Sequence, residues 1–269
     1  MRHTRLLKYA RAENCVLRLN ERHRVAAAHS LKIYKSNSIY TFIPKNACST
    51  MRLSLAMANC CIPDASCIDW IHDNNETFQA SLEDLVAARY TFVILRDPFA
   101  RLASCFLDKI VSKSLPAHRL RDLTKGPLDL DKMSFADFVE LLGDEAVLAG
   151  NMHWRPQTDF LVYDHYDDYF SVENLGGAAA AISDRAALEI CDARPLTAHG
   201  LDRFELLPIN IDHSGTPVGE IAGLKLNGCC PDPRSLFTNP LIVRVAQIYA
   251  SDMALYAETI GPSTFFGTV

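Results

Sequence analysis

A lysine and two hydroxyl side chains lie close together in a short segment that could bind a phosphate group. Residues 44–50 read Pro-Lys-Asn-Ala-Cys-Ser-Thr and follow the apolar run 38–43. A loop that enters a helix N-terminus offers free backbone N–H groups and the positive end of the helix dipole. Lys45 adds a point charge, and Ser49 and Thr50 add hydroxyl donors. The glycines of a Walker A loop are missing, and an ordinary strand–helix turn with a surface lysine is the alternative.

A second segment combines arginine and serine in a way that suits a phosphate monoester. Residues 92–104 read Phe-Val-Ile-Leu-Arg-Asp-Pro-Phe-Ala-Arg-Leu-Ala-Ser. Arg96 comes at the carboxyl end of an apolar strand, which is where open α/β sheets bind ligands. Arg101, Ser104 and Asp108 share one face of the next helix by their spacing. An arginine fork with a serine hydroxyl matches a phosphate. A purely structural pairing of Arg96 with Asp97 is the alternative.

The two segments need strands and helices to position them. Residues 38–43 and 90–95 are apolar and β-branched, as in strands of a buried parallel sheet. Ser49 is a plausible N-cap for a helix that runs to about residue 58. Asp97 followed by proline reads as the start of a helix whose apolar residues recur with helical spacing to residue 110.

Further elements complete an alternation of strands and helices. The pattern predicts helices at 81–88, 134–142, 184–191 and 241–258, a strand at 166–172, loops at 59–75 and 113–131, and an irregular stretch at 192–235. Such alternation is typical of an α/β fold with a central parallel sheet flanked by helices. We expect a single domain over residues 38–258, with a basic, helical N-terminal extension at 1–37 and a tail at 259–269.

Composition narrows the class of protein. The chain has 269 residues, a formal net charge of −5 and nine cysteines. A nucleic-acid-binding protein usually carries a basic excess, so we expect no nucleic-acid partner. An odd number of cysteines without framework spacing favours reduced thiols and a cytoplasmic location. No signal peptide and no apolar run of membrane-spanning length is seen.

Together the two segments resemble those of sulfotransferase family 2. Residues 44–50 look like the family's 5′-phosphosulfate loop, and RDPFARLAS, residues 96–104, looks like its 3′-phosphate motif. The carbohydrate sulfotransferases of the HNK-1 and chondroitin 4-O type are similar in three further stretches, the HWRPQ motif at 153–157, residues 166–175, and the terminal helix. The resemblance covers roughly residues 38–258 and implies a P-loop-like fold.

The sequence also departs from those relatives. They carry a membrane anchor before the domain, and their HWRPQ motif is followed by a cysteine-rich stretch, whereas here Thr158-Asp-Phe-Leu-Val-Tyr-Asp follows. The departures favour a soluble, bacterial relative whose acceptor cannot be carried over from the family.

The resemblance implies transfer of a sulfuryl group from 3′-phosphoadenylyl sulfate (PAPS) to a hydroxyl of a carbohydrate or glycosylated acceptor, with 3′-phosphoadenosine 5′-phosphate (PAP) as product. Lys45 would stabilise the leaving phosphate oxygen. The loop as a whole would hold the 5′-phosphate, through Pro44, Lys45, Asn46, Ala47, Cys48, Ser49 and Thr50. Arg96 and Ser104 would hold the 3′-phosphate. No metal is implied, because lysine and backbone amides supply the positive charge.

The general base is expected to be a histidine. His72 lies between the two cofactor motifs, where related enzymes often place the base, and His153 in HWRPQ is the alternative. Arg155 could face an anionic acceptor. Cys60, Cys61, Cys67 and His72 could in principle bind zinc, but they lack a paired CxxC spacing, so we expect no metal site.

Two other functions compete with the sulfotransferase interpretation. A P-loop-like kinase should have a lysine after a glycine and an acidic magnesium ligand, and neither is evident. A non-catalytic nucleotide-binding or scaffold protein would tolerate the loss of Lys45 or of the base, yet Lys45, Arg96 and Ser104 are all present. The retained residues favour the enzyme.

Overall fold

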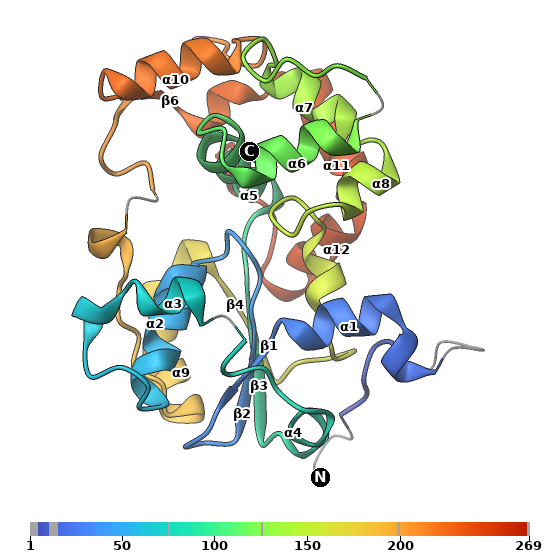
Figure 1. The fold of residues 1–269 in the computed structure, drawn as a ribbon, viewed down its shortest axis with the longest axis vertical. Coiled ribbons are helices and arrows are strands. Elements are labelled where there is room, and N and C mark those ends of the chain that lie inside the picture. Colours follow the sequence, from blue (N-terminus) through green and yellow to red (C-terminus); the bar gives the residue numbers. More distant parts are fainter. Residues whose placement is uncertain (1–4, 11–15, 75, 125, 198–199, 268–269) are drawn as a thin grey trace. The chain divides into compact units, whose positions relative to one another are not determined.

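The computed structural model describes residues 5–10, 16–74, 76–124, 126–197 and 200–267. The chain divides into two compact units, each assembled from two separate stretches of sequence (Figure 1). Unit 1 comprises Met1–Leu95 and Gln157–Ala198, and unit 2 comprises Arg96–Pro156 and His199–Val269. Unit 1 contains a four-stranded sheet, whereas unit 2 is mostly helical.

The sheet of unit 1 is mostly parallel. Its strands, in spatial order, are β1 (Ser30–Ile33), β2 (Ser38–Thr41), β3 (Tyr90–Leu95) and β4 (Asp168–Ser171). β1 runs antiparallel to β2, whereas β2, β3 and β4 are parallel to one another. The carboxyl ends of β2 and β3 therefore lie at the same edge of the sheet, where Thr41 is opposite Val93. The predicted α/β fold with a sheet flanked by helices is confirmed.

Helices cover both faces of this sheet, with α2, α3 and α9 on one side and α1 and α4 on the other (Figure 1). Their bounds are Glu21–Ala28 (α1), Cys48–Ala58 (α2), Trp70–Asp73 (α3), Leu82–Ala87 (α4) and Leu175–Ala186 (α9). Short 3₁₀ turns occupy Leu17–Leu19, Ala65–Cys67, Gln157–Phe160, Val172–Asn174 and Arg194–Leu196.

The central strand β3 anchors the core of unit 1. All six of its residues are buried, and Tyr90, Phe92 and Ile94 belong to the core cluster that α2 and α9 share. The ring centroid of Phe92 lies 5.3 Å from that of Tyr40 on β2 and 6.1 Å from that of Phe170 on β4. Aromatic packing thus joins three neighbouring strands and fixes the edge from which the loop after β2 departs.

Unit 2 packs helices around an aromatic core. The helices are α5 (Pro98–Cys105), α6 (Leu115–Leu123), α7 (Phe135–Leu141), α8 (Glu145–Ala149), α10 (Val218–Leu226), α11 (Asn239–Ile248) and α12 (Ala250–Thr259). A π-helical turn at Phe106–Ile110 continues α5, a 3₁₀ turn spans Pro233–Leu236, and β5 (Glu205–Leu207) pairs in parallel with β6 (Cys229–Pro231).

Trp154 is part of this aromatic core and packs against Phe138. Its side chain is fully buried, and its Nε1 donates a hydrogen bond to the carbonyl oxygen of Val147 at 2.8 Å. The hydroxyl of Tyr249 donates to the carbonyl oxygen of Trp154 at 2.5 Å. The HWRPQ segment is therefore anchored by its tryptophan.

Some predicted elements are wrong or incomplete. Residues 113–131, expected as a loop, contain α6, because Pro116 sits in the first turn of that helix, where a proline costs nothing. The irregular stretch 192–235 contains β5, β6 and α10. A helix at 184–191 is not formed, since α9 ends at Ala186 and Ala187 turns into the left-handed conformation with φ of 52°.

Two further differences lie near the ends of the chain. The single terminal helix expected at 241–258 breaks at Tyr249 into α11 and α12. The stretch 1–37, expected to be a helical extension, also contributes β1 to the sheet. The domain boundaries proposed from the sequence, after residues 37 and 258, stay a prediction.

Candidate functional site

The loop between β2 and α2 has an unusual backbone. Two of its residues lie in the left-handed region, with φ of 73° at Lys45 and 53° at Ala47. A residue with a Cβ atom is strained in this region, and such strain persists where the surrounding structure or a ligand requires it. α2 begins at Cys48 with Ala47 at the N-cap position. The prediction of Ser49 as N-cap is therefore wrong, because the chain enters the helix before it reaches Ser49.

The N-terminus of α2 carries no capping side chain. Ala47 has no side-chain oxygen to cap the helix, and the first turn contains no acidic residue. Ser49 is half-buried, and its hydroxyl makes no hydrogen bond with the described residues. The helix dipole leaves a partial positive charge at this end, and the half-buried Lys45 precedes it in the same loop. This combination can bind a phosphate or sulfate group.

Asn46 fastens the loop to the rest of unit 1. Its side chain is fully buried, and its Nδ2 donates to the carbonyl oxygen of Ile94 at 2.9 Å and to Oε1 of Gln157 at 2.6 Å. The first bond ties the loop to the end of β3. The second ties it to the last residue of the HWRPQ motif. The backbone N–H of Asn46 donates to the carbonyl oxygen of Ile43 at 3.2 Å, so both of its N–H groups are used within the protein and Asn46 serves to hold the loop.

Thr50 and Ser54 tether α2 to the segment that follows α9. The Thr50 hydroxyl oxygen accepts a hydrogen bond from the amide of Ala193 at 3.2 Å. The Ser54 hydroxyl accepts from the amide of Cys191 at 2.8 Å and donates to the carbonyl oxygen of Thr50. Thr50 is buried, and its hydroxyl is used in this hydrogen bond to Ala193.

Behind the loop lie a tyrosine, a cysteine and an arginine that interact electrostatically. Tyr40 is fully buried and its hydroxyl has no hydrogen-bond partner among the described residues. Burial raises the pKa of Tyr40 well above its ordinary value, and it lowers the pKa of Arg52. Cys48 acts on both groups. Arg52 therefore lies close to the first residue of α2.

In unit 2, the N-terminus of α5 is capped by the protein itself. Asp97 is 2% exposed, and its Oδ1 accepts hydrogen bonds from the amides of Phe99 at 2.9 Å and Ala100 at 3.3 Å. Its Oδ2 accepts from the hydroxyl of Ser263. The predicted capping aspartate and first-turn proline are confirmed. Because a carboxylate already occupies these amides, an anion near α5 has to be bound by side chains.

Arg96 and Ser104 are the side chains of unit 2 that the sequence assigns to a phosphate. Both are half-buried, Arg96 directly before Asp97 and Ser104 near the end of α5. Arg101, on the same helix, is buried and donates to the carbonyl oxygens of Arg155 at 2.9 Å and Met152 at 3.4 Å. Arg101 thus holds the HWRPQ segment, and the assignment of Arg96 and Ser104 to a phosphate stays a prediction.

The candidate bases and Arg155 have different surroundings. His72 is exposed on the short helix α3, which packs against α2. His153 is half-buried, and its Nδ1 lies 2.8 Å from Oδ1 of Asn151. Arg155 is half-buried, and its Nε donates to the carbonyl oxygen of Ala149 at 3.1 Å. His153 thus bonds to a residue two positions before it, and Arg155 bonds to the last residue of α8.

Comparison with known proteins gives the family. A parallel sheet with a strained, uncapped loop before α2 defines an α/β protein that can bind an anion at a helix N-terminus. The model of the sulfotransferase family matches residues 33–190, more than half of the chain. The chain therefore belongs to the sulfotransferase family, the carbohydrate sulfotransferase type of family 2, whose members are PAPS-dependent transferases. Searches of curated proteins and of solved structures gave no match.

Two further observations concern metal binding and membrane-spanning helices. Within the part of the chain that the structure describes, no group of three or more His, Cys, Asp or Glu side chains could hold a metal ion. The cysteines considered as zinc ligands together with His72 therefore form no such group. In the same part of the chain, the helices are too short or too polar to span a lipid bilayer.

Sequence reasoning missed two contributors to the loop. Gln157 was noted as part of HWRPQ, but nothing in the sequence indicated that it pairs with Asn46, 111 positions away. Arg52 carried a usable signal, because it lies four residues after Cys48 and thus on the same helix face. Arginine side chains on a helix lean toward its N-terminus, which directs Arg52 toward the loop.

Proposed function

We propose that this protein transfers a sulfuryl group from PAPS to a hydroxyl group of a carbohydrate or glycosylated acceptor by in-line displacement. The observation that carries the proposal is the loop before α2, with left-handed Lys45 and Ala47, an uncapped helix N-terminus and no acidic residue in the first turn. Membership of the sulfotransferase family supports the same donor. When bound, PAPS supplies the activated sulfuryl group.

The loop carries the proposed chemistry at the donor. Lys45 stabilises the negative charge that grows on the bridging oxygen as the S–O bond to the 5′-phosphate breaks. The amides from Ala47 to Thr50 hold the 5′-phosphate at the positive end of α2. Pro44 and Asn46 keep the loop in place, and the Asn46 bond to the end of β3 supports this role. Lysine and amides together provide positive charge without a metal.

Arg96 and Ser104 bind the 3′-phosphate in this proposal. A guanidinium fork pairs well with a phosphate, and a hydroxyl adds one donor. The 3′-phosphate distinguishes PAPS and PAP from AMP and ATP, so these two residues should determine nucleotide selectivity. Asp97 supports this assignment, because it fills the amides of α5 and leaves recognition to the side chains.

A histidine takes the acceptor proton as the new S–O bond forms. We propose His72 as this base, with His153 as the alternative and Arg155 as a contact for an anionic acceptor. The exposure of His72 on α3, next to α2, supports its selection. The cytoplasmic location stays a prediction.

Calorimetric binding tests the donor assignment. Wild-type protein should bind PAP, and it should bind AMP and ATP at least tenfold more weakly. Arg96→Ala should lose the preference for PAP, because the contribution of a charge-assisted contact is gone. Arg89→Ala, which removes an exposed arginine outside the site, is the matched control and should bind as wild type does.

Other outcomes would point to the competing functions. Equal binding of PAP and AMP would remove the 3′-phosphate assignment. Tight binding of ATP with magnesium would favour a kinase. Binding of PAP without sulfuryl transfer to any acceptor would favour a nucleotide-binding scaffold. His72→Ala and His153→Ala then separate the two candidate bases. Because a general base acts only when it is deprotonated, only loss of the base removes the acidic limb from the pH profile of kcat while leaving PAP binding intact.

A further inference from the structure

Helix α2 carries an arginine, Arg52, about one turn after its start. Arg52 follows Cys48 by four residues, so the two side chains share one face of the helix, with Cβ atoms about 5–6 Å apart. Side chains on a helix lean toward its N-terminus. Cys48 and Tyr40 are electrostatic neighbours of the guanidinium. The charge of Arg52 therefore lies close to the start of α2, where the loop that contains Lys45 ends.

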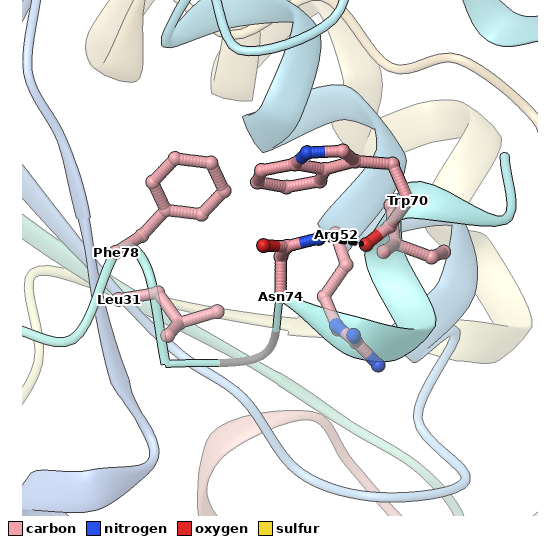
Figure 2. Close-up of a pocket in the computed structure, with 6 residues that line it drawn as sticks. Leu31, Arg52, Trp70, Asn74 and Phe78 are labelled. Carbon is pink, nitrogen blue, oxygen red and sulfur yellow. Dashed lines mark hydrogen bonds between the residues drawn. The ribbon is translucent and has the colours of Figure 1, made fainter. Parts of the chain in front are cut away.

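The Arg52 guanidinium also lies near the other end of the loop. Its Cζ atom is 5.7 Å from the centre of the Phe42 ring, and Phe42 comes directly after β2. The side chain is closely packed, because the space that it lines is too narrow for a water molecule and is shared with Leu31, Trp70, Ile71, Asn74 and Phe78. Figure 2 shows the guanidinium directed away from the Trp70 indole. Packing thus holds this charge near both ends of the loop.

Arg52 lacks a counter-ion. No carboxylate pairs with it among the described residues, and its Nη2 is buried without a hydrogen-bond partner. The sequence around it is also free of acids, since residues 42–63 contain Lys45 and Arg52 but no aspartate or glutamate. A guanidinium stays charged in proteins, and a buried charge without a partner is unfavourable. An anion at the start of α2 would supply the opposite charge.

A second buried polar group beside the same turn has no partner. Tyr40 is fully buried, and its hydroxyl makes no hydrogen bond with the described residues. Cys48 and Arg52 are both among its electrostatic neighbours. A buried polar group without a partner is rare in a folded protein, and a binding or catalytic role is one explanation for it. Two such groups next to the uncapped start of α2 support this explanation for Arg52.

We propose that Arg52 is a second cation of the donor site, a positioning residue whose charge acts on the 5′-phosphate group of PAPS through the first turn of α2. The inference rests on the proposed sulfuryl transfer, because it takes PAPS to be the donor. Lys45 acts on the bridging oxygen in that proposal, whereas Arg52 strengthens the positive potential of the helix N-terminus from the side of the helix. Because Arg52 acts as a charge and not as a bidentate contact, lysine should be able to replace it.

Two nucleotides that differ only in the 5′-phosphate test the proposal. PAP carries a 5′- and a 3′-phosphate, whereas adenosine 3′-phosphate carries the 3′-phosphate alone, and calorimetry gives the affinity for each. We expect Arg52→Met to bind PAP about tenfold more weakly, since partly buried charges interact across several ångströms. The same variant should bind adenosine 3′-phosphate as wild type does. Arg52→Lys should keep the PAP affinity within about threefold, and Arg89→Met, at an exposed arginine, is the control that should change neither affinity.

A purely structural role of Arg52 gives a different result. Loss of a structural residue would weaken the binding of both nucleotides alike, because the whole site would be disturbed. An equal loss for PAP and adenosine 3′-phosphate in Arg52→Met, or an unchanged affinity for PAP, overturns the inference. If Arg52→Met does not fold, Arg52→Gln removes the charge while keeping a polar side chain, and the same pair of nucleotides decides.

Inorganic phosphate separates this inference from the proposed function. If the wild type binds neither nucleotide, the assignment of PAPS fails, and phosphate is then titrated while tryptophan fluorescence is followed. The chain has two tryptophans, and Trp154 is fully buried in unit 2, so Trp70→Phe identifies the responding residue. Phosphate binding that weakens in Arg52→Met would retain the anion site and remove only the donor. No phosphate binding, or binding of equal strength in wild type and Arg52→Met, overturns the inference as well.

Discussion

The two strand–loop–helix segments of this protein differ in how the first turn of the helix is capped. After β3, Asp97 caps α5 with its own carboxylate, and Pro98 occupies the first turn. After β2, the chain bends through left-handed Lys45 and Ala47 and starts α2 with no capping side chain. A helix N-terminus leaves four amides without partners. One segment satisfies its amides with the Asp97 carboxylate, and the other has no side chain that caps its amides.

The cap on α5 contributes to stability, whereas the uncapped start of α2 is suited to binding. A carboxylate at the N-cap stabilises a helix by about 0.5–2 kcal/mol, and the segment after β3 has this gain. The segment after β2 lacks this stabilisation and adds backbone strain. Strain of this kind is typical of functional sites. We therefore expect a change at Lys45, before α2, to affect catalysis, and a change at Asp97, the cap of α5, to affect folding.

The largest expected effect is loss of catalysis in Lys45→Ala. Removal of one group that stabilises transition-state charge lowers kcat by about 10²–10³-fold. The free energy of unfolding should change by less than about 0.5 kcal/mol, since half-buried Lys45 is part of no core cluster. Sulfuryl transfer and urea unfolding are measured on the same preparations. Lys35→Ala, at an exposed lysine, is the control, and a variant at Lys45 that keeps full activity would contradict the comparison.

The next effect is on folding, in Asp97→Ala. The variant leaves the amides of Phe99 and Ala100 and the hydroxyl of Ser263 without their acceptor. We expect the free energy of unfolding to fall by about 2 kcal/mol. Chemical denaturation measures it. Asp97→Asn keeps one capping oxygen and should lose less, so an equal loss in both variants would show that charge, and not the cap, matters at this position.

A smaller effect concerns the bond between Asn46 and Gln157. A double-mutant cycle with Asn46→Ala, Gln157→Ala and the combined variant should give a coupling of about 1 kcal/mol in unfolding free energy. The single change at Asn46 should also weaken PAP binding several-fold, because the loop loses its tie to β3. Calorimetry and denaturation give the two numbers. Additive single effects would mean that the 2.6 Å contact does not contribute to stability.

The smallest effect is a gain in stability from Ala47→Gly. Glycine adopts the left-handed conformation without steric cost and is also a better N-cap than alanine. The strain at φ of 53° should be relieved, and the unfolding free energy should rise by about 0.5–1 kcal/mol, measured by thermal unfolding. Ala100→Gly, inside α5, should instead destabilise. A loss of stability at position 47 would mean that the loop is not strained.

The sequence indicated the elements whose signals are local. β3 is recognisable because the four apolar residues at 92–95 follow Tyr90 and the β-branched Thr91, and Asp97 with Pro98 marks a helix start by its residue types alone. The left-handed turn at Ala47 could not be predicted, because glycine or asparagine normally announces it and neither stands there. Helix α6 was missed for a related reason, since Pro116 suggests a loop unless its place in the first turn is known.

The residues of the candidate site also fall into two groups, those that a local motif indicates and those that only the fold brings together. Lys45, Arg96 and Ser104 could be selected because each belongs to a short motif with a chemical meaning. The Asn46–Gln157 bond and the tether from Thr50 to Ala193 join residues more than 100 positions apart, and only the folded chain brings them together.

The discontinuity of unit 1 imposes an order on biosynthesis. Its sheet needs β4, the loop before α2 needs Gln157 and helix α2 needs Ala193, yet residues 96–156 are made in between and belong to unit 2. At about 5–20 residues per second, the ribosome leaves the β3 edge unpaired for several seconds after β3 has emerged. A nascent chain ending near residue 95 thus exposes a strand edge that invites aggregation, so slower translation of residues 96–171 should lower the soluble yield.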